Sequence, residues 1–318
     1  IYALPRLWTS WSLSCFWLRW QHPLRFSLSI GMDPPTTTGS TQDRLHNRLI
    51  PQAGRRVSAY QEKRGAMEKA ITLATRGLVM EESVVVIGAG GGLGSALVEH
   101  WLAAGAAPVI AVSRQPQPAE LNSSRLHWLR CDYSDEQLAE VVARIGELAP
   151  GPRWLVICNG LLQQGGIRPE KRLEALNLEA MTQLYQTNAL LPLRWISQLL
   201  PLLGSSPCTL AVLSARVGSI GDNRAGGWYG YRAAKVALNM LLKCAAIELA
   251  RRAPGVKLLA FHPGTVDTQL SRPFHGNLAA GSLHSPQQAA AHLVTLMARL
   301  TADGELSYLD WRGEPIEW

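Results

Sequence analysis

The residues best suited to chemistry lie in the stretch from Ser214 to Met240. Tyr231 and Lys235 are four residues apart there and begin an alanine- and leucine-rich run that is typical of a helix. Four residues make about one helical turn, so the phenol and the ammonium are expected on the same helix face. An ammonium beside a phenol lowers the pKa of the tyrosine, which can then exchange a proton with a carbonyl or alcohol oxygen. The alternative is an amphipathic helix with a packed tyrosine and an exposed lysine.

A glycine-rich turn about 140 residues upstream favours the chemical interpretation. It follows the run Val-Val-Val-Ile and precedes a helical pattern, and strand, glycine turn and helix form the first unit of a dinucleotide-binding fold. The glycines fit the spacing Gly88-x-x-x-Gly92-x-Gly94, with Leu93 between the last two. Small residues let the backbone approach a pyrophosphate, which the N–H groups of the helix N-terminus then bind. An ordinary glycine-rich turn is the alternative.

The end of the second predicted strand, residues 108–112, indicates which dinucleotide is bound. A NAD-binding unit usually has an acid about 20 residues after the glycines, where it accepts from the ribose 2′-hydroxyl. Here Ser113 and Arg114 follow the strand, and Arg114 can pair with a 2′-phosphate. NADP is therefore favoured over NAD, with a solvated surface arginine as the alternative.

Two further strand ends supply candidate cofactor-binding residues. Asp132 and Tyr133 follow the third predicted strand, residues 125–129. The Asp132 carboxylate could accept from the adenine amino group, or it could cap the helix that begins at residue 135. Asn159 and Gly160 follow the fourth strand and face the crevice in which such folds bind ligands.

The charge distribution argues against nucleic-acid binding. The net charge is +7, but residues 1–79 hold 11 Lys/Arg against 4 Asp/Glu, whereas residues 80–318 hold 20 of each. The main part of the chain therefore has no net charge with which to hold a polyanion, and it shows no interleaving of aromatic and basic residues. Its five cysteines include no Cys-x-x-Cys pair, and no histidines cluster at metal-ligand spacing. A disulfide framework and a metal site are not expected, and a reducing compartment, the cytoplasm, fits best.

Residues 1–79 differ in character from the rest. The first 30 residues contain three Arg, four Trp and no acid, a composition typical of an organelle transit peptide. Their longest uncharged run, Leu7 to Leu18, is shorter than the ~18 apolar residues of a transmembrane helix. Residues 33–66 predict coil, followed by a short helix around residues 66–74. Because Met80 directly precedes the first strand, the leading hypothesis is that residues 1–79 are dispensable or mis-assigned upstream sequence. A targeting segment and a basic arm are the alternatives.

Together these motifs resemble the short-chain dehydrogenase/reductases over residues 80–318. Five of them occur in the family's order: Gly88-x-x-x-Gly92-x-Gly94, Asn159-Gly160, Asn188, Tyr231-x-x-x-Lys235 and Pro263-Gly264. The segment around Tyr231 and the C-terminal tail DWRGEPIEW are similar to the branch of the C-factor signalling protein and the sniffer-type carbonyl reductases. The resemblance implies one doubly wound, Rossmann-type α/β domain with a mostly parallel seven-stranded sheet.

The resemblance also implies roles for individual residues. Tyr231 would be the general acid and base, and Lys235 would lower its pKa and bind the nicotinamide ribose. Asn188 would kink its helix and hold a water in the proton relay, unless it is merely a solvated polar residue. The nicotinamide-side loop would be shaped by Pro263, Gly264, Val266 and Thr268, with Thr268 contacting the carboxamide or the pyrophosphate. An ordinary Pro-Gly turn is the alternative for that loop.

Two positions depart from the family pattern. The catalytic serine usually stands three residues before a glycine, and counting back from Gly218 reaches Ala215. Either a slight shift of the strand end presents Ser214, or Ser219 or water substitutes for the missing hydroxyl. The usual Asn-Asn-Ala-Gly of strand four has Cys158 before Asn159 here, and we interpret this cysteine as a packing residue because no histidine accompanies it.

The expected function is NADP-dependent hydride transfer to or from a carbonyl/alcohol pair. The loop after Thr268, with Phe274, Leu278 and Leu283, indicates a small and partly apolar substrate. The resemblance further implies a homodimer or homotetramer through helices around residues 181–203 and 234–251. A cofactor-binding regulatory protein with little catalysis is the second hypothesis, because Ala215 replaces the serine.

Overall fold

The computed structural model describes residues 82–318 except residues 107, 205 and 278–281. The hypotheses on residues 1–79, including the short helix around residues 66–74, lie outside the described residues, as does Leu278 of the predicted substrate loop. Within the described part of the chain, no helix is both long and apolar enough to cross a membrane.

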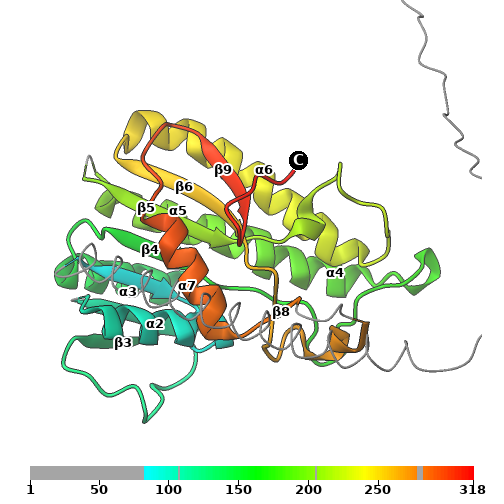
Figure 1. Ribbon diagram of the computed structural model, residues 1–318, viewed down its shortest axis with the longest axis horizontal. Helices are drawn as coiled ribbons and strands as arrows, with labels where there is room; N and C mark the ends of the chain where they lie inside the picture. The colour runs from blue at the N-terminus through cyan, green and yellow to red at the C-terminus, as the bar shows by residue number, and fades with distance from the viewer. Residues whose placement is uncertain (1–81, 107, 205, 278–281) are drawn as a thin grey trace, which may run out of the picture. The chain divides into compact units, whose positions relative to one another are not determined.

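A sheet of seven parallel strands forms the centre of the molecule, in the order β3-β2-β1-β4-β5-β6-β9 (Figure 1). Its strands are β1 (Val84–Ile87), β2 (Val109–Ser113), β3 (Leu126–Arg130), β4 (Trp154–Ile157), β5 (Cys208–Leu213), β6 (Val256–His262) and β9 (Leu306–Asp310). Two short strands, β7 (Thr265–Val266) and β8 (Leu283–His284), pair separately. The predicted doubly wound parallel sheet is confirmed.

Helices cover both faces of this sheet. Residues of β1 alternate between two apolar layers, because successive side chains of a strand point to opposite faces. Val84 and Val86 pack in the layer with α2 and α7, whereas Val85 and Ile87 pack in the layer with α3, α5 and α6. The helices are α2 (Gly92–Ala104), α3 (Asp135–Leu148), α4 (Leu178–Tyr185), α5 (Leu191–Leu199), α6 (Tyr229–Arg252) and α7 (Pro286–Met297). All four residues of β1 are fully buried, as expected for a central parallel strand.

Two predicted helices have different bounds in the structure. The helix predicted over residues 181–203 begins at Leu178 and is interrupted by a π-helical turn, η2 (Gln186–Leu190), between α4 and α5. The helix predicted over residues 234–251 begins five residues earlier, at Tyr229. Tyr231 and Lys235 therefore lie in the first two turns of α6, near the carboxyl end of the sheet.

Candidate active site

The turn between β1 and α2 is so tight that glycine is required at three positions. Gly88 has a φ of +83°, which favours glycine, and a Cβ on Gly94 would lie 2.3 Å from the carbonyl oxygen of Gly88. A Cβ on Gly92 would lie 2.8 Å from Cγ2 of Thr268, so the loop after β6 reaches the start of α2. Gly91 precedes the helix and provides no side-chain cap. The first N–H groups of α2 thus have neither an intrahelical partner nor a side-chain cap, as an anion site requires.

The ends of β2, β3 and β4 are linked through one aromatic side chain. The Arg114 guanidinium lies 5.7 Å from the ring centroid of Tyr133, which has a left-handed φ of 74°. Burial raises the pKa of Tyr133, while a hydrogen bond to Asn159 and the charge of Arg114 oppose the rise. Asn159 is buried, and its Oδ1 has no partner. The structure therefore brings Arg114, Tyr133 and Asn159 together, and the Oδ1 atom of Asn159 is left as an acceptor without a hydrogen bond.

Ser113 and Asp132 lie on either side of this group. A Cβ on Gly90 would lie 2.4 Å from the Ser113 Oγ, so the serine packs directly against the glycine turn. Asp132 is exposed, and its carboxylate accepts from the N–H of Ser134 at 2.8 Å. The cap of α3 is Ser134, whose Oγ accepts from Gln137 N, so the alternative in which Asp132 caps this helix is wrong. The serine is two positions nearer the helix and reaches the N–H that a cap must satisfy.

Tyr231 and Lys235 are both buried on one face of α6, with exposed fractions of 8% and 2%. The Lys235 Nζ donates to the carbonyl oxygen of Leu213 at 2.8 Å and lies 5.8 Å from the ring centroid of Tyr231. Burial lowers the pKa of Lys235 to about 7 and raises the pKa of Tyr231. Burial is the cause of both shifts, so the pKa of Tyr231 lies above its ordinary value and not below it, as the spacing had predicted.

The buried lysine should make stability depend on pH. Between its folded pKa of about 7 and its ordinary value of 10.5, the unfolded state binds more protons, so the free energy of unfolding rises with pH. Across this range, the free energy of unfolding of the wild type should rise relative to that of Lys235→Met by up to about 1.4 kcal/mol per pH unit. Below pH 7 the lysine is charged in both states, and the wild type bears the full cost of burying that charge. Urea unfolding at several pH values measures the difference. Lys243→Met, which removes a half-exposed lysine on the same helix, is the control.

Asn188 holds the π-helical turn to the loop after β4. Its side chain is fully buried, with Nδ2 donating to the carbonyl oxygens of Leu161 at 2.7 Å and Leu184 at 2.9 Å. Its Oδ1 accepts from the N–H of Leu161 at 3.0 Å. A Cβ on Gly160 would lie 3.7 Å from that same oxygen. Asn188 is therefore a buried bridging residue, and the alternative of a solvated helical residue is wrong.

The Ser214 side chain points toward Asn239 on the buried face of α6. Its Oγ donates to Oδ1 of Asn239 at 2.7 Å, and only 4% of the residue is exposed. Ala215, the next residue, packs instead in the apolar cluster that contains Tyr231. A β-strand end alternates its side chains, so only one of the two neighbours can face the site. The hydroxyl of Ser219 accepts from the N–H of Asp222 at 2.9 Å, within its own loop.

The loop after β6 contains the remaining predicted residues. Gly264 has a φ of +75°, and a Cβ there would lie 2.8 Å from the ring of His284. Val266 is buried in β7, which pairs with β8, and the Thr268 side chain lies close to Gly92. The loop that begins at Pro263 and Gly264 therefore reaches the glycine-rich turn through Thr268.

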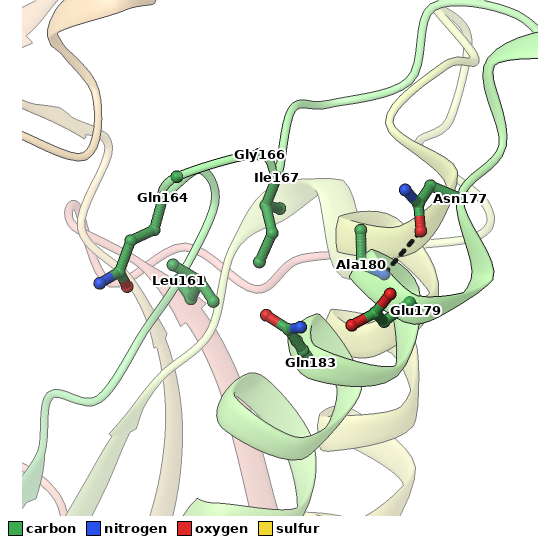
Figure 2. Close-up of a pocket in the computed structure, with 9 residues that line it drawn as sticks. Leu161, Gln164, Gly166, Ile167, Asn177, Glu179, Ala180 and Gln183 are labelled. Atoms are coloured by element: carbon green, nitrogen blue, oxygen red, sulfur yellow. Dashed lines mark hydrogen bonds between the residues drawn. The ribbon is translucent and has the colours of Figure 1, made fainter.

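A cavity of about 500 Å³ lies between the loop after β4 and α4. Figure 2 shows Leu161 and Ile167 on the loop side, with Glu179 and Gln183 on the helix side. Ile167 and Ala180 of this lining also belong to the apolar cluster that contains Tyr231. The other residues that line the cavity are Gln164, Gly165, Gly166 and Asn177.

Several groups at the site were not predicted from the sequence. Trp228 directly precedes α6, and its ring centroid lies 6.3 Å from that of Tyr231. Glu170 is buried and accepts from the N–H of Gly230 at the start of the same helix. The three glycines and aromatics before Tyr231 are a visible signal of an unusual turn, whereas no local pattern marks Glu170. Cys158 packs against the apolar layer that contains α2 and α7, and burial raises its pKa to about 12. In residues 82–318, apart from the gaps given above, no side-chain cluster could hold a metal ion.

Comparison with known proteins identifies one family. The model of the short chain dehydrogenase family matches residues 82–278. A 1-hydroxy-2-glutathionyl-2-methyl-3-butene dehydrogenase of Rhodococcus sp. (strain AD45) is 30% identical over 185 residues, which are 58% of this chain and 76% of that protein. The C-signal protein of Myxococcus xanthus is 30% identical over 139 residues, which are 43% of this chain and 78% of that protein.

Solved structures show the same fold. The carbonyl reductase Sniffer of D. melanogaster superimposes with a TM-score of 0.64 at 22% identity, covering 75% of this chain and all of that one. An NADPH-bound carbonyl reductase from chicken fatty liver superimposes with a TM-score of 0.64 at 25% identity, covering 76% of this chain and 95% of that one.

Proposed function

Because this chain belongs to the short chain dehydrogenase family, we propose that it transfers hydride between NADP(H) and a small carbonyl or alcohol compound, with Tyr231 as general acid and base. The family predicted from the sequence is confirmed, and its relatives include C-signal, which belongs to the predicted branch. The chain is an NAD(P)-dependent dehydrogenase or reductase. The choice of NADP, the substrate and the residue roles are the proposal.

The residues present fit a dinucleotide. The absence of a Cβ at Gly94 lets the start of α2 lie directly against the glycine turn, and the first N–H groups of α2 lack a side-chain cap. These groups would hold the pyrophosphate, with Thr268 closing over it from the loop after β6. The orphaned Oδ1 of Asn159 offers an acceptor near the same crevice. Asp132, with a carboxylate at the rim, would accept from the adenine amino group.

The chemistry divides between cofactor and chain. A nicotinamide cofactor supplies the hydride when it is bound, and the protein supplies position and one proton. In the reducing direction the Tyr231 hydroxyl gives its proton to the carbonyl oxygen, and in the oxidising direction the phenolate takes it from the alcohol. Lys235 stabilises the phenolate when it is charged, and its Nζ is held in place by the carbonyl of Leu213.

One observation carries this proposal. The glycine turn after β1 and the buried pair of Tyr231 and Lys235 lie at the carboxyl edge of the same parallel sheet. The loop after β4 lies beside the glycine turn, because a Cβ on Gly88 would lie 3.1 Å from the Asn159 nitrogen, and Asn188 binds Leu161 of the same loop. Ligands of doubly wound sheets bind at this edge, where the strand order reverses between β1 and β4.

We propose that the cavity beside α4 receives the part of the substrate that does not react. Its apolar side, with Leu161 and Ile167, suits a small apolar group, as the sequence predicted for the substrate. Glu179 is the only charged residue that lines it, so the cavity disfavours an anionic group. Leu283 of the predicted substrate loop is exposed in β8 and is not among the lining residues.

Exposed apolar side chains support the predicted homo-oligomer. Leu178 and Tyr185 on α4 and Met240 and Ile247 on α6 are between 40% and 75% exposed. These are the helices through which the family resemblance predicts association. A dimer or tetramer would remove their apolar surface from water.

Arg114 should decide between NADPH and NADH. Arg114→Ala removes the cation proposed to bind the 2′-phosphate, so the affinity for NADPH should fall by about 10- to 100-fold. The affinity for NADH should change little, because it has no 2′-phosphate. Titration of both cofactors by fluorescence checks this result. Arg251→Ala, which removes an exposed arginine at the end of α6, is the control, and an equal loss for both cofactors would contradict the assignment.

The test of the proposed function is NADPH consumption by the purified chain over a panel of aldehydes, ketones and quinones, with NADH alongside. Turnover with NADPH supports the reductase. Tight NADPH binding without turnover on any carbonyl would instead favour a regulatory protein. Ala215 at the position of the family's serine and the similarity to C-signal are the observations behind this second candidate.

A further inference from the structure

Glu170 is a buried acid in a loop whose neighbouring residues are exposed. Only 4% of it is accessible, whereas Arg168 and Lys171 on either side are exposed. A carboxylate is almost never buried to this extent unless it has partners. Its partners lie 60 residues away in the chain, at the start of α6.

The contacts of Glu170 replace the missing cap of that helix. Trp228 is the residue before α6, and it makes no side-chain cap. The Glu170 carboxylate accepts from the N–H of Gly230, at 3.3 Å for Oε1 and 3.2 Å for Oε2. The Glu170 backbone carbonyl accepts from the N–H of Trp228 at 2.6 Å. A negative charge at a helix N-terminus is also favoured by the helix dipole.

The segment that Glu170 holds has a strained backbone. Gly226, Gly227 and Trp228 have φ angles of 62°, 64° and 53°, so three successive residues are left-handed. Such a conformation is unfavourable for tryptophan and persists only where surrounding contacts impose it. Glu170 provides such contacts, since its backbone and its side chain bind on both sides of Tyr229.

Little space is left for the start of α6 to shift. A Cβ on Gly230 would lie 2.9 Å from Glu170 Oε1, 2.9 Å from the Met181 side chain and 3.0 Å from that of Leu184. The next residue is Tyr231, whose ring packs edge-on against Trp228. Gly230, which Glu170 holds in position, is therefore adjacent to Tyr231, the proposed general acid and base.

We propose that Glu170 is a positioning residue for the reaction. By capping α6 from the loop after β4, it holds the left-handed turn and so places the phenol of Tyr231 and the indole of Trp228 relative to the substrate. The inference rests on the proposed role of Tyr231. It concerns a contact between two segments, which can be measured without turnover.

The experiment compares Glu170→Met with Glu170→Gln in the full chain. Methionine keeps the length of the side chain but removes both acceptors, and it should lower kcat by about 10- to 100-fold, as a small misplacement of a catalytic group does. The KM for NADPH should change less than about threefold, because the glycine turn is untouched. Glutamine retains one acceptor oxygen and should restore most of kcat. Glu174→Met, at an exposed acid of the same loop, should behave as the wild type.

Amide hydrogen exchange supplies the readout that is independent of activity. In Glu170→Met, the amides of residues 229–235 should exchange faster, while those of the central strands keep their protection. If no carbonyl is reduced by the wild type, the proposed function fails, and the exchange data still decide whether Glu170 fixes this turn. If the methionine variant does not fold, the test uses Glu170→Gln alone. The amides of residues 229–235 should then exchange faster in Glu170→Gln, which has one acceptor oxygen in place of two, than in Glu174→Gln.

Three outcomes would overturn the inference. The first is that Glu170→Met has the same amide exchange rates and the same kcat as Glu174→Met. The second is a uniform loss of protection together with loss of NADPH binding, which would make Glu170 a general stability residue. The third, which applies where the methionine variant does not fold, is equal exchange in the two glutamine variants.

Discussion

Replacing Tyr231 by phenylalanine is expected to lower kcat by about 10²- to 10⁴-fold, the usual contribution of a positioned general acid or base. The substitution removes one oxygen and leaves the ring, which packs with Trp228, Leu184 and Ala234 in a buried cluster. Affinity for NADPH should stay nearly unchanged, because the glycine turn and Arg114 are not altered. Single-turnover kinetics and a cofactor titration on the same protein separate the two effects.

Tyr229→Phe provides a matched control for this experiment. Tyr229 lies two residues earlier on the same helix, and its ring does not belong to the buried cluster around Tyr231. Tyr229 is partly buried, and loss of its hydroxyl should leave kcat within about twofold of the wild type, because the proposed proton transfer does not use it. Retained turnover in Tyr231→Phe would rule out the proposed acid and base, whereas equal losses in both variants would point to a general effect on α6.

Replacing Gly94 by alanine is expected to destabilise the protein and weaken cofactor binding together. The new Cβ would lie 2.3 Å from the Gly88 carbonyl oxygen and 2.9 Å from the Cα of Ala89, both of which are backbone atoms. Since backbone cannot rotate away, α2 must move from β1, at a cost of about 1–3 kcal/mol in the free energy of unfolding. The displaced helix N-terminus should also bind NADPH about tenfold or more weakly. Urea unfolding and fluorescence titration measure the two effects.

Gly91→Ala is the control for stability in the same turn. Gly91 has a φ of −84°, which any residue adopts, and its Cβ would lie 3.5 Å from the nearest atom, an ordinary contact. Its free energy of unfolding should change by less than about 0.5 kcal/mol. If Gly94→Ala were as stable as Gly91→Ala, the tight approach of α2 to β1 would not be what requires glycine at position 94.

The sequence by itself determined the features that depend on short stretches of chain. The β-branched run before Gly88 and the spacing of Gly92 and Gly94 predicted the strand, turn and helix, because each step involves neighbouring residues. The four-residue interval between Tyr231 and Lys235 placed both on one helix face for the same reason. The order of these motifs along the chain was enough to predict the family and, through it, the parallel sheet.

Only the tertiary structure decided the features that depend on side-chain direction. Ser214 and Ala215 differ by one position at the end of β5, and the pairing of that strand turns the hydroxyl toward Asn239 and the methyl toward Tyr231. Burial, which no spacing reveals, raises the pKa of Tyr231. These outcomes follow from packing between distant segments.

The contact between Glu170 and Gly230 shows the physical reason most directly. Sixty residues separate them, and no periodicity relates a loop after β4 to the first turn of α6. The sheet brings them together because the carboxyl ends of its parallel strands share one edge, where the connecting loops meet. Local spacing predicts which residues can do chemistry, whereas the fold determines which distant residue holds them in place.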